Sequence, residues 1–443
     1  MNWLEQYRAK CVSATEAMAK VESGNRVYIG AGCAVPHDLV AALSARAESL
    51  TDVEVIHILT VGAAPYIDRE LAGHIRCNAL FVGYNVREAI NEGRADYVPI
   101  HLHQIPRVFK DGPLPLDVAC VVVSPPDEHG FCSFGIEVGV TKPAAQSARY
   151  VVAEINRLMP RTLGDSFIHV SKLDACVEID RPLDTFQTDE IPSVAKEIGR
   201  NVASLIEDGA CLQLGIGGIS EAVLDYLEDK KDLGIHTEMF SDGLQDLMEK
   251  GIVTGERKNF HPGKVVAGFV LGSQDIYDFV HDNPLIEFHP TDYVNNPFNI
   301  ARNDNMVAVN SALQIDLTGQ ICADSLGKFI YSGFGGQVDF MRGAALSQGG
   351  LPICALPATA KEGTISRIVP YLSEGAGVVT TRADAHVVIT ENGIAWMYGR
   401  NVRQRAEALI AIADPSAQEE LYRAAHERGL FGKIRRGVDL GSD

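Results

Sequence analysis

The chain has 443 residues, of which 46% are hydrophobic and 22% charged, and its formal net charge at pH 7 is −19. Its length exceeds that of one hydrophobic core, so at least two domains are expected. The acidic balance disfavours nucleic acid and anionic membranes as partners, because both attract Lys and Arg. A small anionic ligand remains compatible, since loops and single basic side chains bind anions locally.

No apolar run reaches the ~18 residues of a membrane span. Residues 1–24 carry charges throughout, unlike a signal peptide, so a cytoplasmic protein is expected. The nine cysteines are scattered, without a C-x-x-C pair or a matching His pattern. This spacing predicts free thiols, and it gives no reason to expect a bound metal.

Two segments share one plan: a helix end, a glycine, a short apolar strand, a glycine loop and a second helix. They are VESGNRVYIGAGCAVPHDLVAAL (21–43) and IEDGACLQLGIGGISEAVLDYL (206–227). The likeness continues at VIHIL (55–59) and GIHTE (234–238). Such units predict an α/β protein with two related halves and mainly parallel sheets. The alternative is the glycine punctuation that unrelated βα units share.

A polar stretch with two prolines, DRPLDTFQTDEIPS (180–193), precedes a helix expected near Ile191. It predicts a boundary that divides the chain into residues 1–185 and 186–443. Near the end of the second part, DPSAQEELYRAAHERGLF (414–431) predicts a capped amphipathic helix.

Two glycine loops in the second half are suited to bind negative charge. LGIGGIS (214–220) opens a predicted helix, where backbone N–H groups favour an anion. Its spacing does not fit a dinucleotide fingerprint, and a tight turn without a ligand is the alternative. In YSGFGGQVDFMRGA (331–344), Gly335 and Gly336 are candidate amide donors to an oxyanion, with a hairpin turn as the alternative.

The sequence contains neither the G-x-S-x-G motif of serine hydrolases nor the H-E-x-x-H motif of zinc proteases. Two carboxylates at predicted strand ends remain as candidate nucleophiles, Glu238 in LGIHTEMFSDG (233–243) and Glu391 in VVITENGIA (387–395). Ligands bind at the carboxyl edge of parallel sheets, which favours such positions. A solvated surface charge is the alternative for either one.

Together these segments resemble the acetyl-CoA hydrolase/transferase family, and within it the 4-hydroxybutyrate and butyryl CoA-transferases. The resemblance covers nearly the whole chain and rests on SPPDEHGFCSFG (124–135), INRLMPRTLGDSFIHVS (155–171), LGIGGISEAVL (214–224), GIHTEMFSDG (234–243), YVNNPFNIARNDNMVAVNSALQIDLTGQ (293–320), GFGGQVDFMRGA (333–344) and ATAKEGTISRIVP (358–370).

The resemblance implies two tandem domains of the NagB/RpiA/CoA-transferase-like fold, with the acyl pocket shaped by the first and CoA bound mainly by the second. It implies CoA exchange between acetyl-CoA and a short-chain acid, such as butyrate, 4-hydroxybutyrate or a similar C4–C5 acid, through a glutamyl-CoA thioester. The nucleophile falls on Glu238, and Glu391 matches the nucleophile of a more distant branch. The carboxylate must stay ionised, so its pKa is expected not to rise far.

The resemblance assigns the orienting amide to Asn295, with Asn296 beside it left open, and the oxyanion donors to Gly335 and Gly336. Contacts with CoA are implied at Gly215, Ile216, Gly217, Gly218, Gln337, Lys361 and Arg367. The family's properties further imply acyl-CoA and a short-chain carboxylate as partners, no tightly bound cofactor, and a homodimer or homotetramer. An acyl-CoA hydrolase using the same Glu and a non-catalytic CoA-binding module remain as alternatives.

Overall fold

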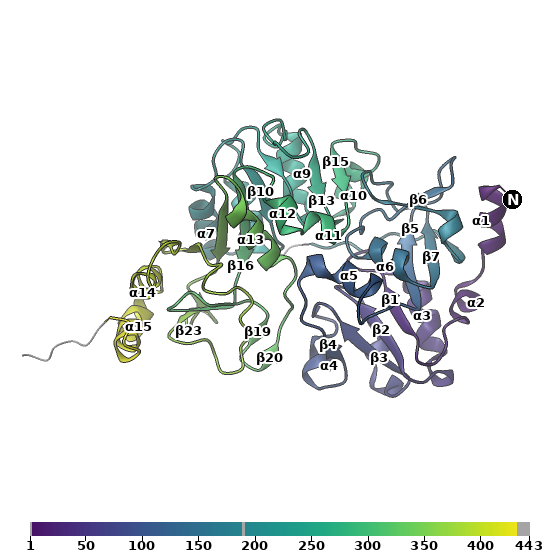
Figure 1. The fold of residues 1–443 in the computed structure, drawn as a ribbon, viewed down its shortest axis with the longest axis horizontal. Coiled ribbons are helices and arrows are strands. Elements are labelled where there is room, and N and C mark those ends of the chain that lie inside the picture. The colour runs from purple at the N-terminus through teal and green to yellow at the C-terminus, as the bar shows by residue number, and fades with distance from the viewer. Residues whose placement is uncertain (1, 188–190, 432–443) are drawn as a thin grey trace, which may run out of the picture.

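The computed structural model describes residues 2–187 and 191–431 and contains one large sheet in each half of the chain (Figure 1). The sheet of the N-terminal half is seven-stranded, and every pair of neighbouring strands is parallel. Its strands, in spatial order, are β4 (Asp96–Tyr97), β3 (Ile75–Ala79), β2 (Val53–His57), β1 (Arg26–Ile29), β5 (Val118–Val123), β7 (Tyr150–Asn156) and β9 (Ala175–Ile179). The all-apolar strand β5 is buried along its length, as expected for a central parallel strand covered on both faces.

The sheet of the C-terminal half is six-stranded and parallel except for the hairpin of its last two strands. Its strands, in spatial order, are β11 (Gly234–Ile235), β10 (Cys211–Leu214), β16 (Met306–Ser311), β21 (Leu351–Ala355), β25 (Val387–Thr390) and β26 (Gly393–Trp396). Strand β1 pairs with β2 on one side and with β5 on the other, and β10 pairs in the same way with β11 and β16. Strands β1 and β10 therefore occupy equivalent places in the two sheets. The predicted α/β fold with two related halves is therefore confirmed.

Fifteen α-helices accompany the strands in the described part of the chain. In the N-terminal half they are α1 (Trp3–Lys10), α2 (Ala14–Met18), α3 (His37–Ala45), α4 (Arg87–Asn91), α5 (Ile105–Lys110) and α6 (Thr141–Ser147). In the C-terminal half they are α7 (Ser193–Ala203), α8 (Gly218–Asp225), α9 (Asp242–Glu249), α10 (Gln274–Val280), α11 (Thr291–Val294), α12 (Pro297–Ile300), α13 (Gln337–Leu346), α14 (Val402–Ala411) and α15 (Pro415–Glu427).

Short strands and 3-10 turns fill the connections between these elements. The short strands pair as β6 (Phe131–Ser133) with β8 (Phe167–His169), β12 (Met239–Phe240) with β14 (Phe269–Val270), β13 (Val265–Ala267) with β15 (Ile286–Phe288), β19 (Ser325–Leu326) with β20 (Phe329–Ile330), β22 (Thr359–Ala360) with β23 (Ile365–Ser366), and β17 (Gln314–Asp316) with both β18 (Ile321–Cys322) and β24 (Ile368–Val369). The 3-10 turns are η1 (Ala47–Ser49), η2 (Pro65–Ile67), η3 (Arg69–Leu71), η4 (Leu102–Gln104) and η5 (Val170–Lys172).

The two halves share one hydrophobic core. A single cluster of buried side chains extends from Tyr7 through Ile136 to Phe288 and Ile389. Main-chain hydrogen bonds also cross the junction, from Leu102 N–H to the Gly335 carbonyl and from Gly139 N–H to the Gly268 carbonyl. Loops of both halves are therefore fixed against each other at the junction.

The predicted boundary stretch 180–193 lies between β9 and α7, which begins at Ser193. Residues 188–190 within it lie outside the described residues, and the division at 185/186 stays a prediction.

Several local expectations are confirmed. The glycine loops at 214–220 and 331–344 lead into α8 and α13, so the second is not a hairpin turn. Helix α15 begins after Asp414, whose carboxylate accepts the Ser416 N–H at 2.9 Å. All nine cysteines are free thiols. No helix within the described ranges combines the length and the hydropathy that crossing a membrane requires.

Candidate active site

Glu238 is a largely buried carboxylate at the junction of the halves. It follows the carboxyl end of β11 and directly precedes β12, and its main-chain carbonyl accepts the N–H groups of Gly268 and Phe269. Its side chain lines a cavity instead of pointing into open solvent. The alternative of a freely solvated surface charge is therefore wrong for this residue.

Two donors hold the Glu238 carboxylate. Asn295 Nδ2 donates a hydrogen bond to Oε2 at 2.9 Å, and the main-chain N–H of Gly336 donates a second. Gly336 is the N-cap of α13, so the carboxylate lies at the positive end of that helix.

Burial raises the pKa of Glu238 to about 7. The hydrogen bond from Asn295 lowers it, the neighbouring Asp339 carboxylate raises it, and the Gly336 N–H lowers it. The expectation that this pKa stays close to its ordinary value is therefore wrong, because desolvation outweighs the two hydrogen bonds. Near neutral pH the protonated and ionised forms coexist.

Gly336 leaves room for this arrangement. A Cβ atom at this position would stand 2.0 Å from Glu238 Oε2 and 2.2 Å from Asn295 Nδ2, well inside van der Waals contact. Sequence reasoning assigned Gly336 to an oxyanion, whereas the folded chain uses its N–H to hold the carboxylate itself. Gly335, with a left-handed φ of 52°, lines the cavity beside it.

The choice between the two adjacent asparagines is decided by the fold. Asn295 ends α11, is fully buried and contacts Glu238. Asn296 instead begins α12, where its side chain accepts the Phe298 N–H at 3.0 Å. Of the two, Asn295 is therefore the asparagine that holds the Glu238 carboxylate.

Sequence reasoning missed a second buried carboxylate near Glu238. Asp339 in α13 is 1% exposed and accepts hydrogen bonds from His103 N and Nδ1 in η4, at 3.1 and 2.7 Å. The contact ties α13 to the first half. The only local signal is one acidic residue within the otherwise apolar run from Val338 to Met341.

The cavity in front of Glu238 has a volume of about 100 Å³ and takes its walls from both halves. It is lined by Ala31, Gly32, Ile58, Leu59, Phe81, Leu102, Glu137, Val140, Ile216, Glu238, Phe269, Thr291 and Gly335. This lining is mainly apolar and includes no Lys or Arg. An uncharged, short apolar group fits such a space.

Two polar side chains besides Glu238 face this cavity. Glu137 is 4% exposed, and its carboxylate accepts the N–H groups of Val140 and Thr141 at 3.2 Å each. Burial raises the pKa of Glu137 to about 7. The hydroxyl of Thr291 is buried and has no hydrogen-bond partner. Thr291 therefore contributes to the wall of the cavity, while its hydroxyl is hidden from solvent and unsatisfied.

A second, more open groove of about 330 Å³ adjoins the glycine loop before α8. Gly217 and Gly218 line it together with Pro357, and Ile216 lines both this groove and the cavity at Glu238. Gly217 has a φ of 111°, a conformation that favours glycine. Gly215 joins β10 to this loop.

The remaining predicted CoA contacts are less directly placed. Gln337 begins α13, and its side-chain Nε2 is buried without a partner. Lys361 is exposed in the loop that follows Pro357, whereas the half-buried Arg367 guanidinium donates to the carbonyls of Thr359 and Ala312.

Glu391 does not line the cavity. Its Oε2 accepts the N–H of Ala358 at 2.9 Å and so supports the loop that carries Lys361. This hydrogen bond gives Glu391 a structural contact within the second half.

Fold and site together define a two-halved α/β protein with a buried carboxylate facing a small apolar cavity at its junction. The model of the acetyl-CoA hydrolase/transferase N-terminal domain matches residues 1–189, and the model of the C-terminal domain of that family matches residues 272–425. The chain belongs to the acetyl-CoA hydrolase/transferase family.

The names of similar proteins agree with this family assignment. The chain is 49% identical to a 4-hydroxybutyrate coenzyme A transferase of Clostridium kluyveri, over 95% of this chain and 98% of the relative. It is 36% identical to a butyryl-CoA:acetate CoA-transferase of Anaerostipes caccae, over 98% of this chain and 100% of the relative. A solved 4-hydroxybutyrate CoA-transferase of Porphyromonas gingivalis superposes with a TM-score of 0.84 at 43% identity, covering 96% of this chain and 100% of that one. The expectation of an enzyme of the CoA-transferase kind is confirmed by these relatives.

Replacing Gly336 by Ala tests the packing at the carboxylate. The new Cβ overlaps Glu238 and Asn295, so both side chains must move and their hydrogen bond is expected to break. Overpacking of this kind costs typically about 1–3 kcal/mol, which thermal unfolding measures as a lowered midpoint. A crystal structure of the variant that keeps the Asn295–Glu238 bond, with an unchanged midpoint, would contradict this description.

Proposed function

We propose that the chain is an acyl-CoA:carboxylate CoA-transferase that exchanges CoA between acetyl-CoA and a short-chain monocarboxylic acid, butyrate or 4-hydroxybutyrate. The observation that carries the proposal is the Glu238 carboxylate, held by Asn295 and Gly336 at a small apolar cavity. A carboxylate is a suitable nucleophile here, because exchange of one thiol between two carboxylic acids is nearly isoenergetic.

In the first half-reaction the Glu238 carboxylate attacks the thioester carbonyl carbon. The C–S bond breaks, CoA leaves as a thiolate, and a mixed anhydride joins the acyl group to Glu238. The thiolate then attacks the glutamyl carbonyl of the anhydride, which gives a glutamyl-CoA thioester and releases the acyl group as a free carboxylate. No proton is gained or lost overall.

In the second half-reaction an incoming carboxylate attacks the glutamyl-CoA thioester and the same steps run in reverse. Negative charge develops beside the N-terminus of α13, where the helix dipole stabilises it. The main-chain N–H groups of Gly335 and Gly336 are the nearest candidate donors for the oxyanion once the carboxylate has reacted.

The groove beside Ile216 suits the pantetheine arm of CoA. Ile216 lines both the groove and the cavity, so a thioester at Glu238 that passes this side chain would place its acyl group in the cavity and its thiol arm in the groove. Lys361 lies in the loop that leaves this groove and is suited to the phosphates of CoA. Binding the long CoA body supplies free energy that positions the reacting atoms.

The cavity favours a short monocarboxylic acid. Its volume of about 100 Å³ is below the usual range for drug-sized ligands and so favours a short acyl chain. A second carboxylate, as in succinate, would find no Lys or Arg in the lining and would meet the Glu137 carboxyl group. A terminal hydroxyl would instead meet Glu137, and a rotation of the buried Thr291 side chain would bring its unpartnered hydroxyl within reach.

Transfer is favoured over hydrolysis by the apolar lining, because it limits access of water to the anhydride. An assay of CoA release with and without acetate distinguishes the two reactions. We expect slow release without the acid and fast exchange with it. Equal rates in both conditions would make the protein a hydrolase. The cytoplasmic location, the absence of a tightly bound cofactor, and a homodimer or homotetramer stay predictions.

Glu238→Gln tests the nucleophile. Loss of the carboxylate is expected to lower kcat for CoA exchange by about 1,000-fold or more. Glu391→Gln is the matched control, since it makes the same change at the second carboxylate and is expected to keep activity within about tenfold. If the two variants exchange these effects, Glu391 is the nucleophile.

The covalent intermediate can be trapped in the same preparation. Borohydride added after acyl-CoA reduces a glutamyl-CoA thioester to the alcohol, and peptide mass spectrometry locates the reduced residue at position 238. An active enzyme whose residue 238 stays unmodified would contradict this route.

The pKa of Glu238 predicts the pH dependence of the first half-reaction. Only the ionised carboxylate attacks, and its pKa is about 7. Thus kcat/KM for acyl-CoA should fall about tenfold per pH unit below pH 7 and level off above it. Initial rates between about pH 5 and about pH 9 measure this, and a flat profile down to the lower limit would show an ordinary carboxylate.

Thr291→Val tests recognition of a terminal hydroxyl. The replacement keeps the shape of the side chain and removes a hydroxyl that has no partner within the protein. We expect kcat/KM for 4-hydroxybutyrate to fall about 3–10-fold, the worth of one hydrogen bond, with butyrate unaffected as the internal control. An equal loss with both acids would assign Thr291 to the general shape of the cavity.

A further inference from the structure

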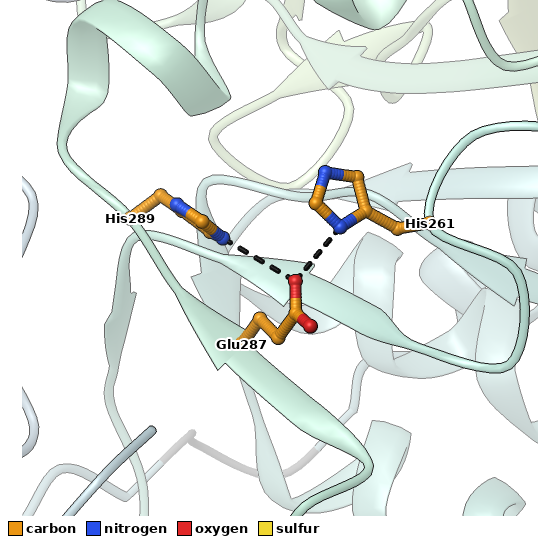
Figure 2. A group of neighbouring side chains, drawn as sticks. All are labelled: His261, Glu287 and His289. Carbon is orange, nitrogen blue, oxygen red and sulfur yellow. Dashed lines mark hydrogen bonds and ion pairs between the residues drawn. The ribbon is translucent and has the colours of Figure 1, made fainter. Parts of the chain in front are cut away.

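Three side chains in the C-terminal half converge on one point, and none of them lines the cavity at Glu238 (Figure 2). His261 Nδ1 lies 2.7 Å from Glu287 Oε2, and His289 Nε2 lies 3.5 Å from the same oxygen. The potential ligand atoms of the three residues all lie within 4.8 Å of one another. Their side chains are 15–25% exposed, so the group is mostly shielded from solvent.

The local structure explains why these residues meet. Glu287 lies in the middle of β15 and His289 follows its end, two positions on, so both side chains face the same side of the strand. His261 comes from the loop before β13, the strand that pairs with β15. Its left-handed φ of 52° turns the chain at this position.

A fourth residue orients the two imidazoles. The Tyr293 hydroxyl lies 2.7 Å from His261 Nε2, and the Tyr293 ring stacks on His289 with centroids 4.6 Å apart. Metal-binding histidines almost always use their second nitrogen for such a contact, which fixes the ring and its tautomer.

We propose that His261 Nδ1, Glu287 and His289 Nε2 form a binding site for one zinc-type divalent cation, with water as the fourth ligand. Two imidazoles and one carboxylate suit Zn²⁺ and other first-row transition-metal ions of similar softness, whereas Mg²⁺ and Ca²⁺ prefer oxygen ligands alone. His289 and Tyr293 also line a polar cleft of about 540 Å³, which gives an ion and its water a path from solvent.

The position of the cluster gives it a structural role. The main-chain N–H of His289 donates to the Ala267 carbonyl. Gly268, which follows Ala267 in the chain, donates its N–H to the carbonyl of Glu238. Tyr293 precedes Asn295 by two residues on α11. A bound cation therefore fixes the segment 287–295 that positions Asn295, without entering the reaction itself.

The same contacts also form a plain ion-pair network without a metal, and binding measurements separate the two possibilities. The full chain, carrying no histidine tag and stripped with a chelator, is dialysed against ZnCl₂ and analysed by elemental mass spectrometry. We expect one equivalent of zinc per chain. The double variant His261→Gln/His289→Gln should weaken binding by about 100-fold or more.

His129→Gln is the matched control. His129 also lies beside a glutamate, with Nε2 3.4 Å from Glu128 Oε1, but it is 73% exposed and belongs to no group of three ligands. Its loss should leave zinc binding unchanged.

Two further measurements keep the test decisive if the double variant fails to fold. The unaltered chain with Co²⁺ should show ligand-field absorption of a nitrogen–oxygen site, and Glu287→Gln, which keeps the side-chain size, should abolish it. Zinc, and not Mg²⁺, should raise the thermal unfolding midpoint of the unaltered chain. Substoichiometric zinc, absent cobalt absorption, or variants that bind as tightly as the unaltered chain would each overturn the proposal.

Discussion

The site depends on one constraint, the burial of a carboxylate at the start of α13. Glu238 is largely removed from water but keeps two hydrogen-bond donors, and the balance leaves its pKa near 7. A fully solvated glutamate is a weak nucleophile because water stabilises its charge, whereas a buried one without donors stays protonated. The intermediate environment keeps a usable ionised fraction in a place where water has little access.

The donors come from elements that are far apart in sequence. Asn295 ends a short helix, and Gly336 begins a longer one after a glycine turn. The missing side chain at Gly336 is what allows the helix N-terminus to approach the carboxylate so closely. Asp339, one turn further on, ties the same helix to His103 of the first half and adds a like charge that opposes ionisation.

The shared core of the two halves makes the cavity a product of both. Leu59 and Leu102 come from the first half, while Ile216 and Phe269 come from the second. The related halves have diverged at the position that matters: the segment GIHTE ends on Glu238, whereas the corresponding VIHIL ends on Leu59. Both residues line the same cavity, one with a carboxylate and the other with an apolar side chain.

Sequence by itself determined the α/β class and the two related halves, and it reduced the candidate nucleophiles to the carboxylates of Glu238 and Glu391. Glycine punctuation and apolar strands recur locally, and a Glu after a strand end is visible without any long-range contact. Only the tertiary structure decided that Asn295 and not Asn296 reaches Glu238, that Gly336 holds the carboxylate, and that Asp339, Glu137 and Thr291 lie near it. The group of His261, Glu287 and His289 was hidden as well, because His261 precedes Glu287 by 26 residues and meets it only through the pairing of β13 with β15. These outcomes depend on desolvation and on contacts between distant segments, which no local pattern of residues encodes.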